Sequence, residues 1–403
     1  MAFKAFFVFY ISLHFASFHN DAIVKGNNLN LLISERKQET PLKRVLTEHG
    51  DTYDCINVYE QPSLKHPLLR NHRIQMRPSH KIRKMIAKMK HKKLPPGVQH
   101  AKIKLDEACP KGTIPVLRVV DKDLSKNVSN LYKPQSNEGN QNLEFAGIFT
   151  QTTPDKKYQS NLATISVYNP QVGPHQYSSA AISVEAGNGA DFNQIQIGWT
   201  VYPDLFNGDT RTHWYFKMIN NGNLSGCYNL NCLGFVQTNT QVAIGTAMDK
   251  VSKYSTEDQV VFRFSIIRQE GTEVRNASWW LLVYNDDNDY DSIGYFPATQ
   301  FNELAGGADK LQWGGYVLSS RDDNTSPPMG SGHFDNGVYQ RTCFMSQVEL
   351  VDHNFDLVDS PTGVQTAMSR CYLEGDESYK NDGKTGYSFC FGGTGGSESD
   401  CEQ

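Results

Sequence analysis

An alternation of apolar and polar residues constrains this chain more than any other feature. In residues 194–202, QIQIGWTVY, every second residue from Ile195 to Val201 is apolar, whereas Gln196 and its alternate neighbours are polar or small. This is the pattern of a β-strand with one buried face. Turn residues at 207–209 then reverse the chain into a second alternating run at 211–218. The pattern predicts an antiparallel pair of strands on which Gln196 points away from the apolar layer.

Similar runs recur through the C-terminal two thirds of the chain, with turn residues between them. They lie at 163–167, 180–184, 262–266, 278–284 and 311–318. A body of about 260 residues built from such short strands is a closed antiparallel sandwich or barrel, and it is long enough to bury a core. We expect an all-β body, an antiparallel, jelly-roll-like β-sandwich.

The first twenty residues are typical of a signal peptide. Lys4 precedes an apolar run at 5–18 that suits a signal sequence but is too short to cross a bilayer. We expect a secreted, extracellular protein, and no later stretch is a candidate membrane span. Four Asn-x-Ser/Thr triplets agree with secretion and are candidate glycosylation sites: Asn127, Asn223, Asn276 and Asn324.

Charge divides the remaining chain into two parts. Residues 21–133 carry 23 Lys and Arg against 11 Asp and Glu, a net charge of about +12, whereas residues 134–403 carry 15 against 32, about −17. Secretion removes nucleic acid as a partner, so we expect the basic part to be a prodomain that binds the acidic body. The polar run 134–142 is the expected linker, and the body is 143–403.

The prodomain is expected to be a small α+β unit. Apolar residues at helical spacing in 41–49 and in 85–89 predict two helices, and 113–120 is typical of a strand.

Several long motifs then resemble one family, neprosin, whose members are secreted plant proteins. They are IQIGWTVYPDLFNGDTRTHWY with GCYNLNCLGFVQ, WGGYV, PPMGSGHF and FGGTGGSESDC in the body, and YDCINVYEQPSLKHPLLRNHRIQMRPS with CPKGTIPVLR upstream. The upstream motifs resemble the activation-peptide domain of that family. The resemblance implies prolyl endopeptidase chemistry by two glutamates, an apoplast or cell-wall location, and proline-rich peptides or wall polymers as partners.

Eight cysteines in a secretory context favour disulfides over metal ligation. The spacing of Cys227 and Cys232 lacks the second half of a zinc site, so we expect no metal. With the family motifs as a guide, we pair Cys55 with Cys109, Cys227 with Cys232, and Cys371 with Cys401. Cys343 and Cys390 are additions to the family pattern, and a fourth bridge between them is expected.

The resemblance places the two catalytic glutamates at 196 and 316, where this chain has Gln196 and Tyr316. An amide accepts no proton near neutral pH and a phenol is a poor base in acid, so the proton shuttle of paired carboxylates is missing. Glu185 and Glu303 are candidate substitutes. The residues expected to line the binding groove are His213, Tyr215, Trp199, Trp313 and His333.

Three functions follow from these residues, and none requires a cofactor. The first is a secreted neprosin-like protein that keeps a peptide-binding groove but is impaired as an enzyme. The second is an active glutamic-type prolyl endopeptidase that uses displaced carboxylates. The third is a carbohydrate- or wall-binding β-sandwich, because exposed aromatic side chains suit sugar rings as well as prolines.

Overall fold

The computed structural model describes fourteen stretches of the chain: residues 41–89, 94, 96–118, 141–152, 156–220, 222, 226–271, 277–285, 289–320, 325–334, 338–369, 371–374, 380–382 and 385–397. These ranges leave out the predicted signal peptide, the linker up to residue 140, Cys401 and the asparagines of the four glycosylation triplets. The last two residues of the expected linker, Gln141 and Asn142, belong to a strand.

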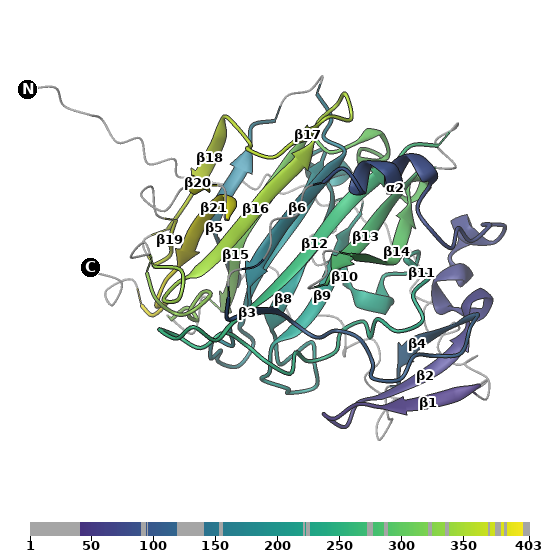
Figure 1. Cartoon of the computed structure of the whole chain (residues 1–403), viewed down its shortest axis with the longest axis horizontal. Coiled ribbons are helices and arrows are strands. Elements are labelled where there is room, and N and C mark those ends of the chain that lie inside the picture. The colour runs from purple at the N-terminus through teal and green to yellow at the C-terminus, as the bar shows by residue number, and fades with distance from the viewer. Residues whose placement is uncertain are drawn as a thin grey trace, which may run out of the picture. The chain divides into compact units, whose positions relative to one another are not determined.

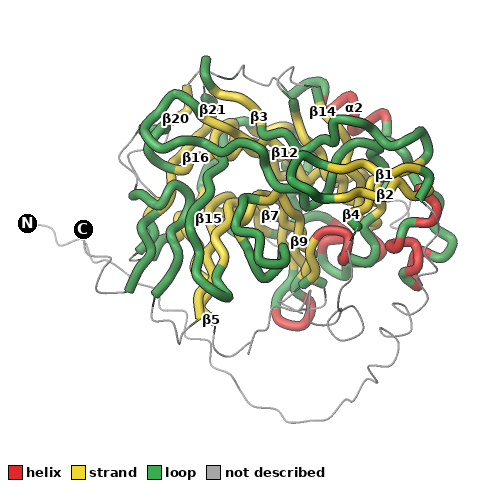
Figure 2. The backbone as a smooth tube through the Cα atoms, turned by 90° about the horizontal axis from the view of Figure 1, so that it is seen from below, coloured by secondary structure: helices red, strands yellow, loops and turns green. Residues whose placement is uncertain are grey.

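Two sheets, antiparallel apart from one parallel pairing, contain most of the strands of the described chain (Figures 1 and 2). The first, here called the front sheet, has the order β10-β9-β8-β7-β15-β5-β18. Its strands are β5 (Gln141–Thr150), β7 (Tyr177–Ala186), β8 (Asn193–Val201), β9 (His213–Ile219), β10 (Cys227–Tyr228), β15 (Lys310–Ser320) and β18 (Val364–Ala367).

The second sheet, here called the back sheet, follows the order β11-β14-β13-β12-β6-β16-β21-β19, with β3, β17 and β20 paired beside this path. Its strands are β3 (Val98–His100), β6 (Ser160–Ser166), β11 (Val236–Gln237), β12 (Gln259–Gln269), β13 (Ser278–Tyr284), β14 (Tyr290–Pro297), β16 (Cys343–Val351), β17 (Leu357–Val358), β19 (Leu373–Glu374), β20 (Lys380–Asp382) and β21 (Gly386–Gly392).

The main apolar core lies between the two sheets and uses the alternating residues of both. Ile197 and Trp199 of β8 share this core with Phe262 and Phe264 of β12. Because alternate side chains of a strand point to opposite faces, the polar partners of these residues face away from the core. The prediction of an all-β antiparallel sandwich is confirmed, in the sandwich rather than the barrel form.

Buried tryptophans tie the two sheets together by hydrogen bonds as well as by packing. The indole nitrogens of Trp199 and Trp313, on the front sheet, donate to the carbonyls of Ser166 and Leu162 on β6 of the back sheet, at 2.9 and 3.3 Å. A buried indole N–H needs such a partner, because an unpaired donor away from water is costly. These bonds fix which face of each strand points inward.

The N-terminal part contains a small sheet of order β1-β2-β4 and one α-helix among the described residues. Its strands are β1 (Lys43–Leu46), β2 (Thr52–Asn57) and β4 (Thr113–Leu117), and the helix is α2 (His80–Ile86); 3₁₀ turns span Val58–Glu60, Pro62–Lys65 and Pro67–Leu69. The expected strand at 113–120 is confirmed over the residues of β4. None of the helices in the described ranges is long and apolar enough to cross a membrane.

The helix expected at 41–49 is wrong, because these residues form β1 and a turn into β2. Val45 is buried, but Leu42 and Leu46 are 71% and 70% exposed, so the helical spacing of the three does not mark one buried face. Gly50, with φ of 86°, closes the turn in a conformation that favours glycine. The second helix exists but begins earlier than expected, at α2, where the Ser79 side chain accepts from the backbone N–H of Ile82.

Two of the four expected disulfides are present: Cys55–Cys109 and Cys227–Cys232. Cys371 is also disulfide-bonded, and its expected partner Cys401 lies outside the described residues.

The expected bridge between Cys343 and Cys390 is wrong, since neither residue forms a disulfide. In the register of β16 and β21, Cys343 is opposite Phe391 and Cys390 is opposite Phe344. The two cysteines are therefore offset by one residue and lie on opposite faces of the back sheet. Cys343 belongs to the main core, whereas Cys390 packs with Phe344 in a separate cluster.

Replacement of Trp313 by alanine tests the importance of the core between the sheets. We expect Trp313→Ala to lower the free energy of unfolding by about 3–5 kcal/mol, the usual cost of removing a buried aromatic ring. Leu143→Ala on the paired strand β5 is the control, because Leu143 is 58% exposed and its removal should change stability by less than about 0.5 kcal/mol. Chemical denaturation followed by fluorescence measures both.

Alkylation of the unreduced protein tests the cysteine assignment. In the native protein at neutral pH we expect Cys343 to resist modification, because burial raises the pKa of its thiol to about 12. After denaturation without reductant, both Cys343 and Cys390 should be labelled, as read by peptide mass spectrometry. A disulfide-linked peptide that joins the two would contradict the structure.

Candidate functional site

Gln196 and Tyr316 lie on the same face of the front sheet, the face that points away from the core. In the register, Gln196 of β8 is opposite Ser183 of β7, and Ser183 is opposite Gln312 of β15. Tyr316 is four residues further along β15, so its parity is the same as that of Gln312. The side-chain parity predicted from the sequence is confirmed. We call this outer surface of strands β9, β8, β7, β15 and β5 the site face.

The amide of Gln196 is only 6% exposed and is held in place by a neighbouring phenol. The hydroxyl of Tyr215, on β9, donates to Gln196 Oε1 at 2.8 Å. Burial raises the pKa of Tyr215 above its usual value, so the phenol keeps its proton. Gln196 therefore acts here as a hydrogen-bond acceptor whose partner is a neutral donor.

The phenol of Tyr316 reaches back across the site face towards Gln196. Its hydroxyl is 2.9 Å from the side-chain amide of Gln312. Burial raises the pKa of Tyr316 well above its usual value and the negative charge of Glu185 adds to this rise, while hydrogen bonds with Ser183 and Gln196 partly offset it. Tyr316 therefore stays a neutral phenol at any pH at which a peptidase works.

Glu185 on β7 is the carboxylate of this cluster, and it is 6% exposed. Ser183 Oγ and Gln194 Nε2 donate to its Oε1 at 3.0 and 2.7 Å, and Lys310 Nζ lies 3.8 Å from its Oε2. Gln312 completes the set when its amide is turned so that both ends are satisfied: the nitrogen donates to Glu185 Oε1 at 3.0 Å and the oxygen accepts from Lys310 Nζ at 2.6 Å. These hydrogen bonds all go to Oε1, whereas Oε2 faces the Lys310 ammonium at ion-pair distance.

The residues in the middle of the site face are small, so no long side chains project from the sheet there. Gly198, Ala181, Gly314 and Gly147 are opposite one another on four adjacent strands. A Cβ at Gly314 would lie 2.7 Å from the ring of Phe145 and 2.3 Å from the carbonyl of Ala146. The ring of Phe145 therefore rests against the strand, and it also packs on the ring of Tyr316 at a centroid distance of 4.8 Å. The sheet needs glycine here because a side chain would displace this ring.

Lys217 is a second cation on the site face, after Lys310. Lys217 of β9 is opposite Gln196 in the register, and its ammonium lies 5.4 Å from the centre of the Tyr228 ring. Although its side chain is only partly shielded from solvent, burial lowers the pKa of Lys217 to about 8.

His213 also lies on this face, but its hydrogen bonds go to a loop. Its Nδ1 donates to the carbonyl of Gly245 at 2.8 Å, its Nε2 lies 3.2 Å from Asp209 Oδ2, and its ring stacks on Phe206. The Nδ1 hydrogen bond and the ring stacking give His213 a structural role.

Four of the residues expected at the site are elsewhere. Trp199 and Trp313 are fully buried in the core between the sheets, because they have the opposite parity to Gln196 and Tyr316. Glu303 is exposed beyond the end of the strands, beside Gly187. His333 stacks on Tyr254, and its carbonyl lies over Gly392 of the back sheet. Of the expected groove residues, the structure places Tyr215 and His213 on the site face.

Sequence reasoning missed Lys310, Gln312, Gln194 and Lys217 as members of the cluster. The alternation of the strands contained a signal for two of them. Gln312 is an even number of residues from Tyr316 on one strand and so shares its face, as Gln194 does with Gln196 on another. Which strands are neighbours was not available from the sequence. Across the described ranges, no group of three or more His, Cys, Asp or Glu side chains is close enough to hold a metal ion.

Asp209 provides a pH-dependent test of the loop that holds His213. Burial opposes ionisation of Asp209, but hydrogen bonds from His213 and Arg211 outweigh it and hold the pKa of this carboxyl well below its usual value. A depressed carboxyl pKa stabilises the fold above about pH 4, and this stability is lost as the pH falls below that value. We expect Asp209→Asn to lower the free energy of unfolding by about 1.5–3 kcal/mol at pH 7 and by progressively less below pH 4.

The matched control for this measurement is Asp204→Asn. Asp204 is an exposed residue that pairs with His175, and its replacement should cost less than about 1 kcal/mol at either pH. Urea denaturation at several pH values gives both curves. If Asp209→Asn lowered the free energy of unfolding equally at pH 7 and pH 3, the depressed pKa of Asp209 would be contradicted.

Comparison with known families and structures agrees with these motifs. The sequence model described as Neprosin matches residues 174–394, and that described as Neprosin activation peptide matches residues 44–158. Among solved structures, a scytalido-glutamic peptidase with a transition state analog inhibitor is 11% identical with a TM-score of 0.33, and it covers 62% of this chain and 98% of its own. SCP-B, a member of the Eqolisin family of peptidases in a complex with a tripeptide, is 10% identical with a TM-score of 0.32 and the same coverage. The chain belongs to the neprosin family.

Proposed function

We propose that this chain is a secreted neprosin-family protein that binds peptide on the site face but is impaired in peptide hydrolysis. One observation carries the proposal: the two positions that the family resemblance assigns to catalytic glutamates hold an amide and a neutral phenol. Both are tied into hydrogen bonds with other uncharged groups of the site face.

The chemistry of hydrolysis explains why these substitutions matter. Paired carboxyl groups divide the work, because an ionised one takes a proton from water and a protonated one gives a proton to the carbonyl or the leaving nitrogen. Tyr316 still has a proton to donate, since its pKa is raised by burial. Gln196 accepts no proton. The site therefore keeps a donor and lacks a base, which typically costs 10²- to 10⁴-fold in rate.

Glu185 is the residue that favours the alternative, an active endopeptidase with a displaced carboxylate. It is a buried carboxylate in the same cluster as Gln196 and Tyr316. Its Oε1, however, already accepts hydrogen bonds from Ser183 and Gln194, and its Oε2 faces Lys310. A base must receive a proton from water, so a carboxylate that is held by these donors at one oxygen and by a cation at the other suits an orienting role better.

Aromatic side chains on the site face suit a peptide ligand. Tyr202, Tyr215, Tyr228 and Tyr316 form one cluster against which Phe145 and Tyr177 pack. The four tyrosines are each 8% exposed or less, so Phe145 and Tyr177, which are partly exposed, are the rings that a ligand would reach first. Extended, proline-rich segments dock in aromatic-lined grooves with little loss of conformational entropy. Secretion is supported by the apolar run at 5–18 and by the disulfides Cys55–Cys109 and Cys227–Cys232, which persist in oxidising compartments.

Restoration of the two glutamates tests the proposal. The native protein should bind a fluorogenic proline-rich peptide between pH 3 and 7 with little or no cleavage. The double variant Gln196→Glu, Tyr316→Glu should cleave it at least about 100-fold faster, because it regains the proton shuttle. Thermal unfolding of each variant shows whether the added carboxyl groups leave the protein folded.

Two controls make the result decisive. Gln365→Glu adds a carboxylate to the same sheet at an exposed position and should leave cleavage unchanged. Glu185→Gln removes the alternative base without changing the size of the side chain. Efficient cleavage by the native protein that is lost in Glu185→Gln would show an active enzyme and overturn the proposed impairment.

A further inference from the structure

The helix α2 and the chain before it cover an apolar area of the back sheet. Leu69, Ile82, Ile86 and Met89 are each 4% exposed or less, and they pack in one cluster with residues of the back sheet. Figure 1 shows α2 over the ribbon of this sheet, near β13 and β14. On the sheet side the cluster includes Trp280, Leu282, Tyr284, Tyr295, Ile267 and Val351. Removal of this cover would expose a broad aromatic surface to water, which is unfavourable in proportion to its apolar area.

Backbone pairing joins the same N-terminal part to the body. β3 pairs in parallel with β12, with Val98 opposite Gln259 and His100 opposite Val261. Further along the chain, the backbone N–H of Leu105 donates to the carbonyl of Gln241 at 2.9 Å, and that of Cys109 donates to Thr240 at 2.8 Å. Leu105 and Cys109 are buried, and breaking their bonds without other partners is costly.

The N-terminal part also contributes side chains to the interior of the body. Ile103 is 4% exposed and belongs to the main core between the two sheets. The amides of Gln61 and Gln237 are both buried: Gln61 Oε1 accepts from the backbone N–H of Gln237 at 2.8 Å, and Gln61 Nε2 donates to the carbonyl of Gln237 at 3.2 Å. Tyr53 is fully buried, and its hydroxyl donates to the carbonyl of Ile244.

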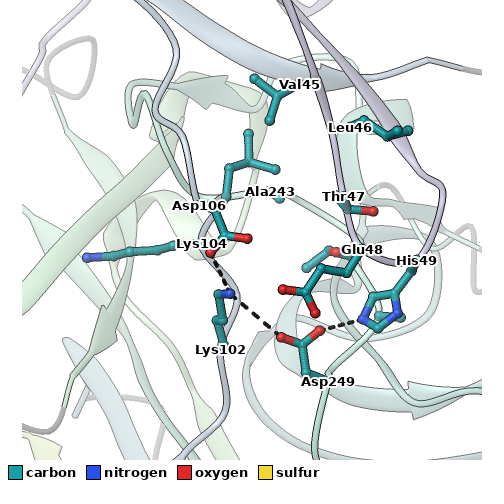
Figure 3. Close-up of a pocket in the computed structure, with 13 residues that line it drawn as sticks. Val45, Leu46, Thr47, Glu48, His49, Lys102, Lys104, Asp106, Ala243 and Asp249 are labelled. Atoms are coloured by element: carbon teal, nitrogen blue, oxygen red, sulfur yellow. Dashed lines mark hydrogen bonds and ion pairs between the residues drawn. The ribbon is translucent and has the colours of Figure 1, made fainter.

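The ion pairs across this contact, which include Lys104–Asp291, lie nearer to solvent than the apolar cluster. Lys81 and Glu270 are 2.7 Å apart, but their side chains are 65% and 44% exposed. Figure 3 shows a small pocket at the edge of the contact, where His49 and Lys102 reach Asp249. Exposed pairs of this kind contribute about 0–1 kcal/mol each and weaken in salt. The opposite charges of the two halves therefore do not account for the contact.

We infer that residues 41–118 are a lasting structural subunit of the body, held by apolar burial and β-pairing rather than by charge. They stay bound as a separate chain after the connection at 119–140 is cut. No disulfide ties the segment to the body, because its two cysteines, Cys55 and Cys109, are bonded to each other. The contacts described above go to the back sheet and to the loop at 237–249. None of these contacts is with Gln196, Glu185 or Tyr316 on the site face, so the segment itself does not hold these side chains.

Controlled cleavage of the full-length protein tests this inference. A recognition sequence for a site-specific protease is placed within residues 121–138, and the purified protein is cut to completion. Size-exclusion chromatography is then run at low salt and in about 1 M NaCl, where charges are screened beyond about 3 Å. We expect the two fragments to co-elute under both conditions and to separate on a denaturing gel.

Two classes of substitution in the cut protein identify the interactions that hold it. Ile82→Ala and Ile86→Ala should each raise the dissociation constant of the fragments by about 30-fold or more, which is the lower end for a buried Ile→Ala change. The exposed control Lys81→Gln should raise it by less than about 5-fold.

The outcomes separate clearly. Elution of the body without 41–118 at low salt would overturn the inference, and so would dissociation that occurs only in 1 M NaCl, since charge would then hold the segment. The test is independent of the proposed peptide binding. A cut protein that stays associated supports the inference whether or not the site face hydrolyses peptides.

Discussion

Burial of alternate residues between two sheets is the constraint on which the rest of this structure depends. Once Ile197 and Trp199 pack in the core against the back sheet, Gln196 has to point to the other side of its strand. The same argument applies on β15, where burial of Trp313 turns Tyr316 outward. The indole hydrogen bonds to β6 make the choice of face unambiguous. The position of the candidate site is thus a consequence of core packing.

The site face combines buried polar groups that satisfy one another. Tyr215 donates to Gln196, Gln312 bridges Tyr316 and Glu185, and Glu185 faces Lys310. Such a network is stable because every member has a partner, and removal of one member leaves another without its hydrogen bond. A hydrolytic site needs at least one group that is free to exchange a proton with water. The proposed impairment rests on that property, because the amide of Gln196 accepts no proton near neutral pH.

The back sheet gives the N-terminal part a different role from the one that its charge suggested. The net charges of the two halves are opposite, and ion pairs such as Lys81–Glu270 do form. Yet the side chains that are buried in the contact are Ile82, Ile86 and Ile103, together with backbone strands. Opposite charge speeds and orients association, whereas burial of apolar area supplies most of its free energy. Charge and apolar burial act in the same contact, and the apolar burial determines how long the two parts stay bound.

The sequence by itself determined the local geometry of this protein: the strands of the body, the parity of Gln196 and Tyr316, and the pairs Cys55–Cys109 and Cys227–Cys232. The strands and the parity follow from alternation, which is a property of neighbouring residues. The two cysteine pairs follow from the long family motifs. Only the tertiary structure decided what depends on strand pairing. The register of β16 and β21 places Cys343 and Cys390 on opposite faces, and the order β9-β8-β7-β15 brings Lys217, Gln196, Ser183 and Gln312 into one row. Strand order and register are set by contacts between distant segments, so no local pattern contains them.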